Sequence, residues 1–154
     1  MKDCFNNDLT NLDCLFHGSP KKLDVIEPRE AHDSNENAEN EDTAVFLTSS
    51  FLLASAYAFK DSIKELNDGL DWDFDFNYDP DTKDINIIFS NVKIDDDIEG
   101  YIYTVPYSEN YEHHGRSIQY KCHEKIKPTD VVKIRFGDYK KYYQINGSKT
   151  NRIR

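Results

Sequence analysis

The chain has 154 residues, of which 38% are hydrophobic, 31% charged and 13% aromatic. This length fits a single domain over residues 1–154, and the aromatic content excludes a wholly disordered chain. Six glycines and five prolines exclude collagen-like and low-complexity classes. No apolar run reaches the roughly 20 residues of a membrane-spanning helix, and the first residues lack the apolar segment of a secretory signal. We therefore expect a cytoplasmic protein that has no membrane partner.

The net charge of −10 is distributed unevenly along the chain. Residues 131–154 carry seven Lys or Arg against one acidic residue, so the rest of the chain is strongly acidic. An acidic body repels phosphate backbones, which disfavours nucleic acid as a partner. Two interpretations of the basic segment stay open: a solvated end that faces the acidic body, or a contact with an acidic partner.

The cysteines and the acidic runs do not predict a metal site. Cys4, Cys14 and Cys122 are an odd number without paired spacing, which favours reduced thiols over a disulfide framework. No second pair of zinc ligands accompanies Cys14 and His17. The acidic run that begins at Asp71 lacks the Gly and Glu positions of a calcium loop.

The first half of the chain predicts three short strands, a loop and one helix. Strands are expected over 12–17 and 23–27, the first closed by a Gly-Ser-Pro turn and the second by a proline. The polar stretch over 31–42 has no apolar periodicity and predicts a mobile loop. A buried strand over 44–48 then leads into a helix from about 50 to 66, because apolar residues recur there at helical spacing.

The second half changes to strand periodicity. Aromatic residues alternate with acidic ones over 72–78, which predicts a strand with one apolar and one acidic face. A turn over 79–84 joins it to a second hairpin strand, 85–89. One helix among many short strands gives an α+β class. Further strands are expected at 100–107, 117–123, 130–136 and 139–145.

Four of these segments together carry the pattern that bears on function. They hold His17-Gly18-Ser19, Phe46, Tyr57 eleven residues later, the strand over 100–105, and Gln119-Tyr120. In this order the segments resemble the ADP-ribosyltransferases of the diphtheria-toxin and poly(ADP-ribose) polymerase branch, which use a His-Tyr-Glu set on three strands. The strand over 100–105 also resembles the rifampicin-modifying transferases. The resemblance implies a compact fold of two packed, mostly antiparallel sheets with one main helix.

The resemblance implies NAD as substrate and a role for each matching residue. His17 would bind a ribose hydroxyl of the adenosine half, and the Gly18 backbone would pair with the nicotinamide amide, supported by Ser19. Phe46 and Tyr57 would sandwich the nicotinamide ring, a role that needs a flat aromatic face. The expected reaction transfers a single ADP-ribose from NAD to a protein or small-molecule acceptor and releases nicotinamide.

Two positions depart from the family pattern, and Gln119 is the more serious departure. Phe46 replaces a tyrosine but keeps the ring. Gln119 replaces the catalytic glutamate, so its amide can orient the ribose but cannot supply negative charge to the oxocarbenium-like transition state. Glu112 is the candidate substitute for that charge. The alternative interpretation is that Glu112 is an exposed acidic residue of a loop. Arg29 is a candidate for gripping the NAD pyrophosphate, or else a surface residue.

Three functional hypotheses follow from the sequence. The first is a mono-ADP-ribosyltransferase-like enzyme, whose activity Gln119 puts in doubt. The second is a pseudoenzyme in which the same pocket binds NAD, ADP-ribose or a partner without turnover. The third is an unrelated α+β interaction domain, in which the aromatic strand builds a core and the basic segment meets a partner.

Overall fold

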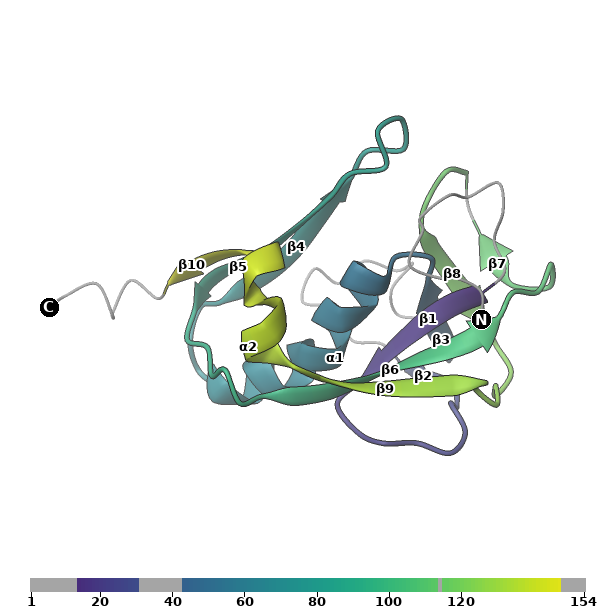
Figure 1. The fold of residues 1–154 in the computed structure, drawn as a ribbon, viewed down its shortest axis with the longest axis horizontal. Coiled ribbons are helices and arrows are strands. Elements are labelled where there is room, and N and C mark those ends of the chain that lie inside the picture. Colours follow the sequence, from purple (N-terminus) through teal and green to yellow (C-terminus); the bar gives the residue numbers. More distant parts are fainter. Residues whose placement is uncertain (1–13, 31–42, 114, 148–154) are drawn as a thin grey trace, which may run out of the picture.

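The computed structural model describes residues 14–30, 43–113 and 115–147, and these residues form two sheets around one main helix (Figure 1). Nearly all strand pairs are antiparallel, so the predicted α+β class is confirmed. The expected loop over 31–42 lies outside the described residues. Among the described helices, none combines the length and the apolar character needed to cross a membrane.

The larger sheet has the strand order β7-β8-β3-β1-β6-β9, with β2 pairing to one end of β3. The central strand β1 pairs with β6 along its whole length, but with β3 only at Phe16 opposite Thr48. The rest of β1, from His17 to Ser19, is therefore not paired with β3. The strands are β1 (Cys14–Ser19), β2 (Arg29–Glu30), β3 (Thr43–Thr48), β6 (Glu99–Pro106), β7 (Glu112–His113), β8 (Gln119–Cys122) and β9 (Asp130–Arg135).

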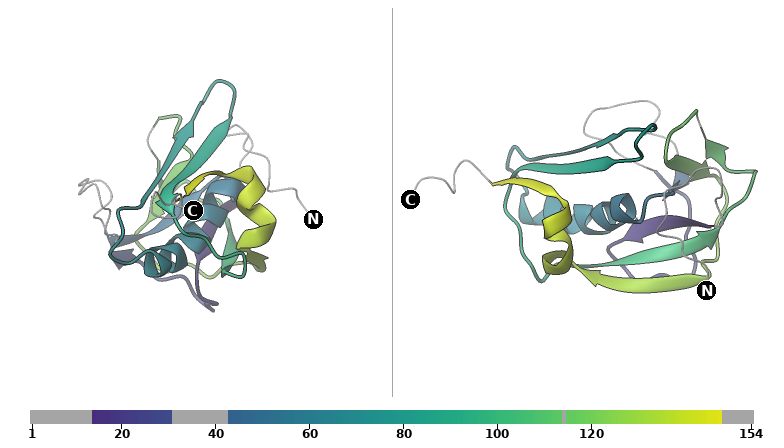
Figure 2. Two further views of the ribbon diagram at one scale, coloured as in Figure 1. Left: turned by 90° about the vertical axis from the view of Figure 1, so that its left-hand side faces the viewer. Right: turned by 45° about the horizontal axis from the view of Figure 1, so that its top comes forward.

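Helix α1 (Phe51–Leu66) lies between the two sheets (Figure 2). It begins at the predicted boundary, where the Ser50 hydroxyl accepts the backbone N–H of Leu53 as an N-cap. Its buried face packs on β1 and β6 below and on β5 above. Aromatic side chains fill the shared core; Phe59, for example, makes an edge contact with Phe136 at 5.3 Å between ring centroids.

The smaller sheet is built from β4 (Asp73–Tyr78), β5 (Ile85–Val92) and β10 (Gln144–Gly147), the last running parallel to β5. Strands β4 and β5 form the predicted hairpin, which projects beyond the rest of the molecule (Figure 1). Burial alternates along β4, with Phe74, Phe76 and Tyr78 half-buried toward α1 and the acidic residues between them exposed. The predicted two-faced strand is thus confirmed.

Three sequence expectations about elements are wrong in part. The segment 23–27 is not a strand: it shares only an isolated bridge between Ile26 and Ile126, and the Tyr103 hydroxyl accepts the Leu23 N–H instead. The first strand continues through Gly18 and Ser19 rather than ending before them. The segment 139–145 is mostly helical, because α2 (Phe136–Tyr139) and a 3₁₀ helix (Lys140–Tyr142) precede the short β10.

The cysteines also differ from expectation. Cys14 is disulfide-bonded, and its partner lies outside the described residues, while Cys122 is a free thiol. The prediction of reduced thiols is therefore wrong for Cys14. Disulfides persist mainly in oxidising compartments, so this bond argues against the reducing environment that the odd cysteine count suggested.

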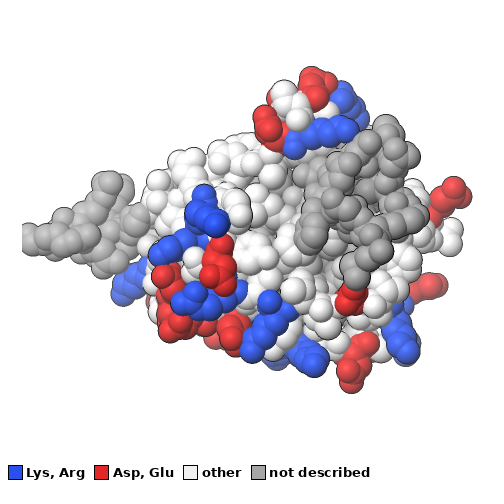
Figure 3. Space-filling view, in the orientation of Figure 1, with Lys and Arg blue, Asp and Glu red and all other residues white. Residues whose placement is uncertain are grey.

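Three of the four described basic residues of the C-terminal segment (Lys133, Arg135 and Lys140) pair with acidic residues of the body. Arg135 lies 3.2 Å from Asp97 and Lys140 lies 3.0 Å from Asp96. On the face in Figure 3, charged side chains gather at the hairpin tip and along the edge formed by α2 and β9, and the surface between them is uncharged. For residues 131–147 the structure thus favours the interpretation of a solvated segment that faces the acidic body.

Candidate active site

His17 and Phe46, on neighbouring strands, are joined by a hydrogen bond. The Nδ1 atom of His17 lies 2.9 Å from the backbone oxygen of Phe46, in the region where β1 and β3 have parted. A carbonyl oxygen can only accept, so Nδ1 carries the proton and Nε2 presents a lone pair. Within the described residues, no hydrogen bond to Nε2 is formed. The ring is therefore fixed with an acceptor atom available to a ligand.

The protonation state of His17 follows from its surroundings. Burial lowers its pKa below the ordinary value of 6.5, the bond to the Phe46 carbonyl opposes that shift, and the positive charge of Arg29 adds to it. The ring is thus neutral near pH 7, which is the form that accepts a hydroxyl proton. Arg29, on β2 opposite Ala44, lies close enough for its charge to act on His17.

Tyr57 and Gln119 form a second pair, between helix α1 and strand β8. The Tyr57 hydroxyl lies 3.4 Å from Oε1 of Gln119, a long separation for an O–H···O bond. The Tyr57 ring also packs on Phe74 of the hairpin at 5.8 Å between centroids, and Lys60 lies over both rings. Tyr57 is half-buried, as His17 is, whereas Gln119 is exposed.

The strand register relates the two pairs. Thr48 of β3 stands opposite Phe16 on one side and opposite Gln119 on the other, so these three side chains share the face that carries α1. His17 follows Phe16 and is directed to the other face, where its ring lies 6.5 Å from that of Tyr103. The register therefore places His17 and the Tyr57–Gln119 pair on opposite faces of the sheet.

Lys121 joins the candidate site residues, and sequence reasoning missed it. It lies opposite Phe46 in the β3–β8 ladder, and its ammonium group is 5.8 Å from the centre of the Phe46 ring. The signal was present in the sequence, because Lys121 follows Gln119 by two residues and a strand places both on one face. A cation here adds to Arg29 as an attraction for phosphate.

Gly18 and Ser19 have structural roles. A Cβ atom on Gly18 would lie 2.1 Å from the Ala54 carbonyl oxygen and 2.7 Å from the Ala58 nitrogen, so helix α1 occupies the space that the missing side chain leaves. The role of the Gly18 backbone toward a nicotinamide amide stays a prediction, because the helix occupies only the direction of the missing Cβ. Ser19 is buried, and its hydroxyl oxygen accepts the backbone N–H of Lys21 across a turn.

Glu112 is held away from Gln119 by a histidine. It lies on β7 opposite Lys121, one diagonal step from Gln119, a separation of about 7–8 Å in an antiparallel pair. Its carboxylate instead lies 2.5 Å from Nε2 of His123, whose Nδ1 is 3.2 Å from the Thr43 oxygen.

The described cavity lies beside these pairs and is lined by other residues, which belong to the hairpin and to segment 116–118. Comparison with known proteins adds nothing to this geometry: no family model, no curated protein and no solved structure matches the chain.

Proposed function

We propose that the chain is an NAD-binding, ADP-ribosyltransferase-like protein that transfers a single ADP-ribose to an acceptor and releases nicotinamide. One observation carries the proposal: a neutral His17, fixed by Phe46 at 2.9 Å, has an Nε2 atom that forms no hydrogen bond within the described part of the chain, and the cation of Arg29 acts on the ring. An acceptor for a ribose hydroxyl beside a positive charge for a diphosphate is the combination that a dinucleotide requires.

The remaining residues support an extended ligand. The sequence resemblance gives the adenosine ribose to His17 and the nicotinamide to Phe46 and Tyr57. Phe46 and Tyr57 lie on the side of the sheet that carries Gln119, and His17 is directed to the other side. A bent dinucleotide has two separated ends, so it is suited to two such groups. Lys121, above the Phe46 ring, adds a second cation along the path.

Gln119 gives specific support to the pseudoenzyme alternative. Cleavage of the nicotinamide–ribose bond needs negative charge near the developing cation. Gln119 has none, and the carboxylate of Glu112 is paired with His123 at 2.5 Å. We infer that NAD binding is better developed than turnover. The cytoplasmic location expected from the sequence stays a prediction, and the disulfide at Cys14 counts against it.

The test is a thermal-shift titration of the full chain with NAD, ADP-ribose and nicotinamide. A ligand at 100 times its Kd stabilises a protein by about 2.7 kcal/mol, or roughly 5–10 °C for this size. We expect NAD and ADP-ribose to raise Tm and nicotinamide alone to do so less. Incubation with labelled NAD then separates transfer from binding. No shift with either dinucleotide would leave the interaction domain as the better hypothesis.

A further inference from the structure

Strand β9 forms one border of the larger sheet, and among the described residues no strand pairs with its outer side (Figure 1). The Phe136 N–H donates to the Ile98 oxygen, so this pair and every second pair before it exchange hydrogen bonds with β6. The backbone groups of Val131 and Lys133 therefore point away from β6. The Val131 N–H agrees with this direction, because it donates to its neighbour's carboxylate, Oδ1 of Asp130, at 3.1 Å.

The border strand carries uncovered valines on both faces of the sheet. Val131 is 41% exposed and Val132 is 44% exposed, and successive side chains of a strand point to opposite faces. A partner that docks on one face would cover only one of them. A further strand brings side chains to both faces and also pairs with the outward backbone groups. The pattern therefore favours an added strand as the partner.

The other described sheet edges are short or protected by charge. Strands β7 and β10 have two and four residues. Strand β4 has six, like β9, but registers of β4 with a second β4 centred on Asp75, Phe76 or Asn77 all set two aspartates opposite each other. These are Asp75 with itself, Asp73 with Asp79, and Asp75 with Asp79. Like charges opposite one another destabilise a strand pair, so β9 is the edge on which pairing is least opposed.

We propose that β9 pairs antiparallel with β9 of a second copy of this chain, about a twofold axis at Val132. In this register Val132 stands opposite Val132 of the second copy. Val131 stands opposite Lys133, and their outward backbone groups exchange hydrogen bonds. A register centred on Lys133 would set two lysines opposite each other, and one centred on Val131 would set Asp130 opposite Val132.

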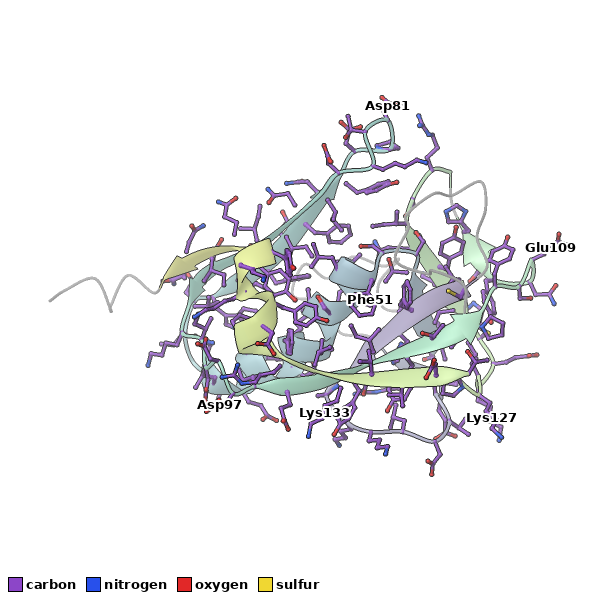
Figure 4. The ribbon with its side chains drawn as sticks, in the orientation of Figure 1. Phe51, Asp81, Asp97, Glu109, Lys127 and Lys133 are labelled. Atoms are coloured by element: carbon purple, nitrogen blue, oxygen red, sulfur yellow. The ribbon has the colours of Figure 1, made fainter. Side chains whose placement is uncertain are left out.

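Lys133, in the middle of β9 (Figure 4), does not guard this edge as an unpaired lysine would. Its ammonium group lies 3.2 Å from the Glu99 carboxylate on β6, which offsets its charge. Pairing has a cost, because it displaces Asp130 from the Val131 N–H. Two strand edges also form a small interface, so we expect a weak dimer with a Kd of about 10–100 µM.

Sedimentation velocity of the full chain without NAD, in about 150 mM salt, tests the dimer. We expect the monomer mass at about 1 µM and an approach to the dimer mass at about 500 µM. Val132→Lys sets two cations opposite each other at the axis, so it should raise the Kd at least about tenfold. Leu66→Lys is the matched control, because Leu66 is 42% exposed at the end of α1, and it should leave the Kd unchanged.

Crosslinking through the axis tests the register and does not depend on how Val132→Lys folds. Opposed residues that share no hydrogen bonds have Cα atoms about 4.5 Å apart, within reach of a disulfide. In a Cys122→Ser background, we expect Val132→Cys to form a covalent dimer under mild oxidation. Its rate should exceed that of Leu66→Cys by about tenfold, measured on non-reducing gels.

The proposal fails if the chain keeps the monomer mass at 500 µM, and the β9 edge would then be left to an extended segment of another protein. It also fails if Val132→Lys does not weaken the dimer, or if Val132→Cys crosslinks no faster than Leu66→Cys. None of these measurements involves NAD, so their outcome leaves the proposed function untouched.

Discussion

The two halves of the candidate site differ in how firmly they are built. His17 is half-buried, its tautomer is fixed by the Phe46 carbonyl, and a charge acts on it from Arg29. Tyr57 is half-buried and Gln119 is exposed, and the two meet at 3.4 Å, longer than a normal O–H···O bond. Preorganised groups stabilise a bound state without paying for reorganisation. Under the proposed function, this difference leads us to expect that ligand binding at β1 is better developed than catalysis at β8.

The largest effect is expected at Gly18, where strand β1 meets the helix that carries Tyr57. Gly18→Ala places a Cβ at 2.1 Å from a backbone oxygen, which a flexible side chain cannot relieve. We expect a loss of about 3 kcal/mol or more in the free energy of unfolding, measured by urea denaturation. Gly115→Ala is the control, because Gly115 has φ +57 and open space around it, and costs about 1 kcal/mol. Equal costs would refute the packing role of Gly18.

The second prediction completes the catalytic half. Gln119→Glu supplies the negative charge that the site lacks, and removing or restoring such a contact changes a rate by roughly a hundredfold. We expect the rate of NAD hydrolysis, measured as nicotinamide release, to rise by about that factor. The affinity for NAD should change little. The control is Glu112→Gln in the Gln119→Glu background. It should leave the raised rate unchanged if residue 119 supplies the catalytic charge.

The outcome at Gln119 distinguishes two explanations. If Gln119→Glu gains nothing and Glu112→Gln abolishes a basal rate, the catalytic charge belongs to Glu112, released from His123. If neither change affects nicotinamide release, the chain does not cleave NAD, and the pseudoenzyme hypothesis is retained.

Elements with local signals were predictable from the sequence, and elements set by distant contacts were not. Helix α1 begins after Ser50 as predicted. Its capping residue and its apolar spacing both lie within about 20 consecutive residues, so no distant contact is needed to predict it. The segment 23–27 looked like a strand by composition, yet its Leu23 N–H pairs with a tyrosine 80 residues away. Tertiary context overrides strand propensity in such cases.

The residues of the candidate site can be named from the sequence, but their arrangement in space cannot. Period-2 reasoning places Gln119 and Lys121 on one face, although the importance of Lys121 needed the β3–β8 register. The bond from His17 to Phe46 spans 29 residues, and the contact of Gly18 with α1 depends on how the helix docks. No local pattern encodes either contact.

The third prediction separates the two functions of the His17 ring. His17→Asn keeps a donor for the Phe46 carbonyl but removes the acceptor at the Nε2 position, whereas His17→Ala removes both. We expect both variants to lose about tenfold in NAD affinity, one lost hydrogen bond near a charge. Only His17→Ala should lower Tm, because it leaves a carbonyl unsatisfied. Unchanged NAD affinity in His17→Asn would contradict the proposal that Nε2 of His17 binds NAD.

The smallest effect is a dependence of stability on pH. Burial lowers the pKa of His17 in the folded chain, and the unfolded chain keeps the ordinary value of 6.5. Above that value both states are neutral and the group contributes no pH dependence. As pH falls below 6.5, the unfolded chain gains a proton first, so stability declines by at most about 1.4 kcal/mol per pH unit until the folded pKa is reached. Subtracting the urea-denaturation profile of His17→Asn cancels the other histidines, and a flat difference between pH 5 and 7 would contradict the depressed pKa. The pKa of Asp79 is lowered by the N–H groups of Asp81 and Thr82 from its ordinary value of 3.8. Its effect on stability therefore falls near and below pH 3.8, outside the range from pH 5 to 7.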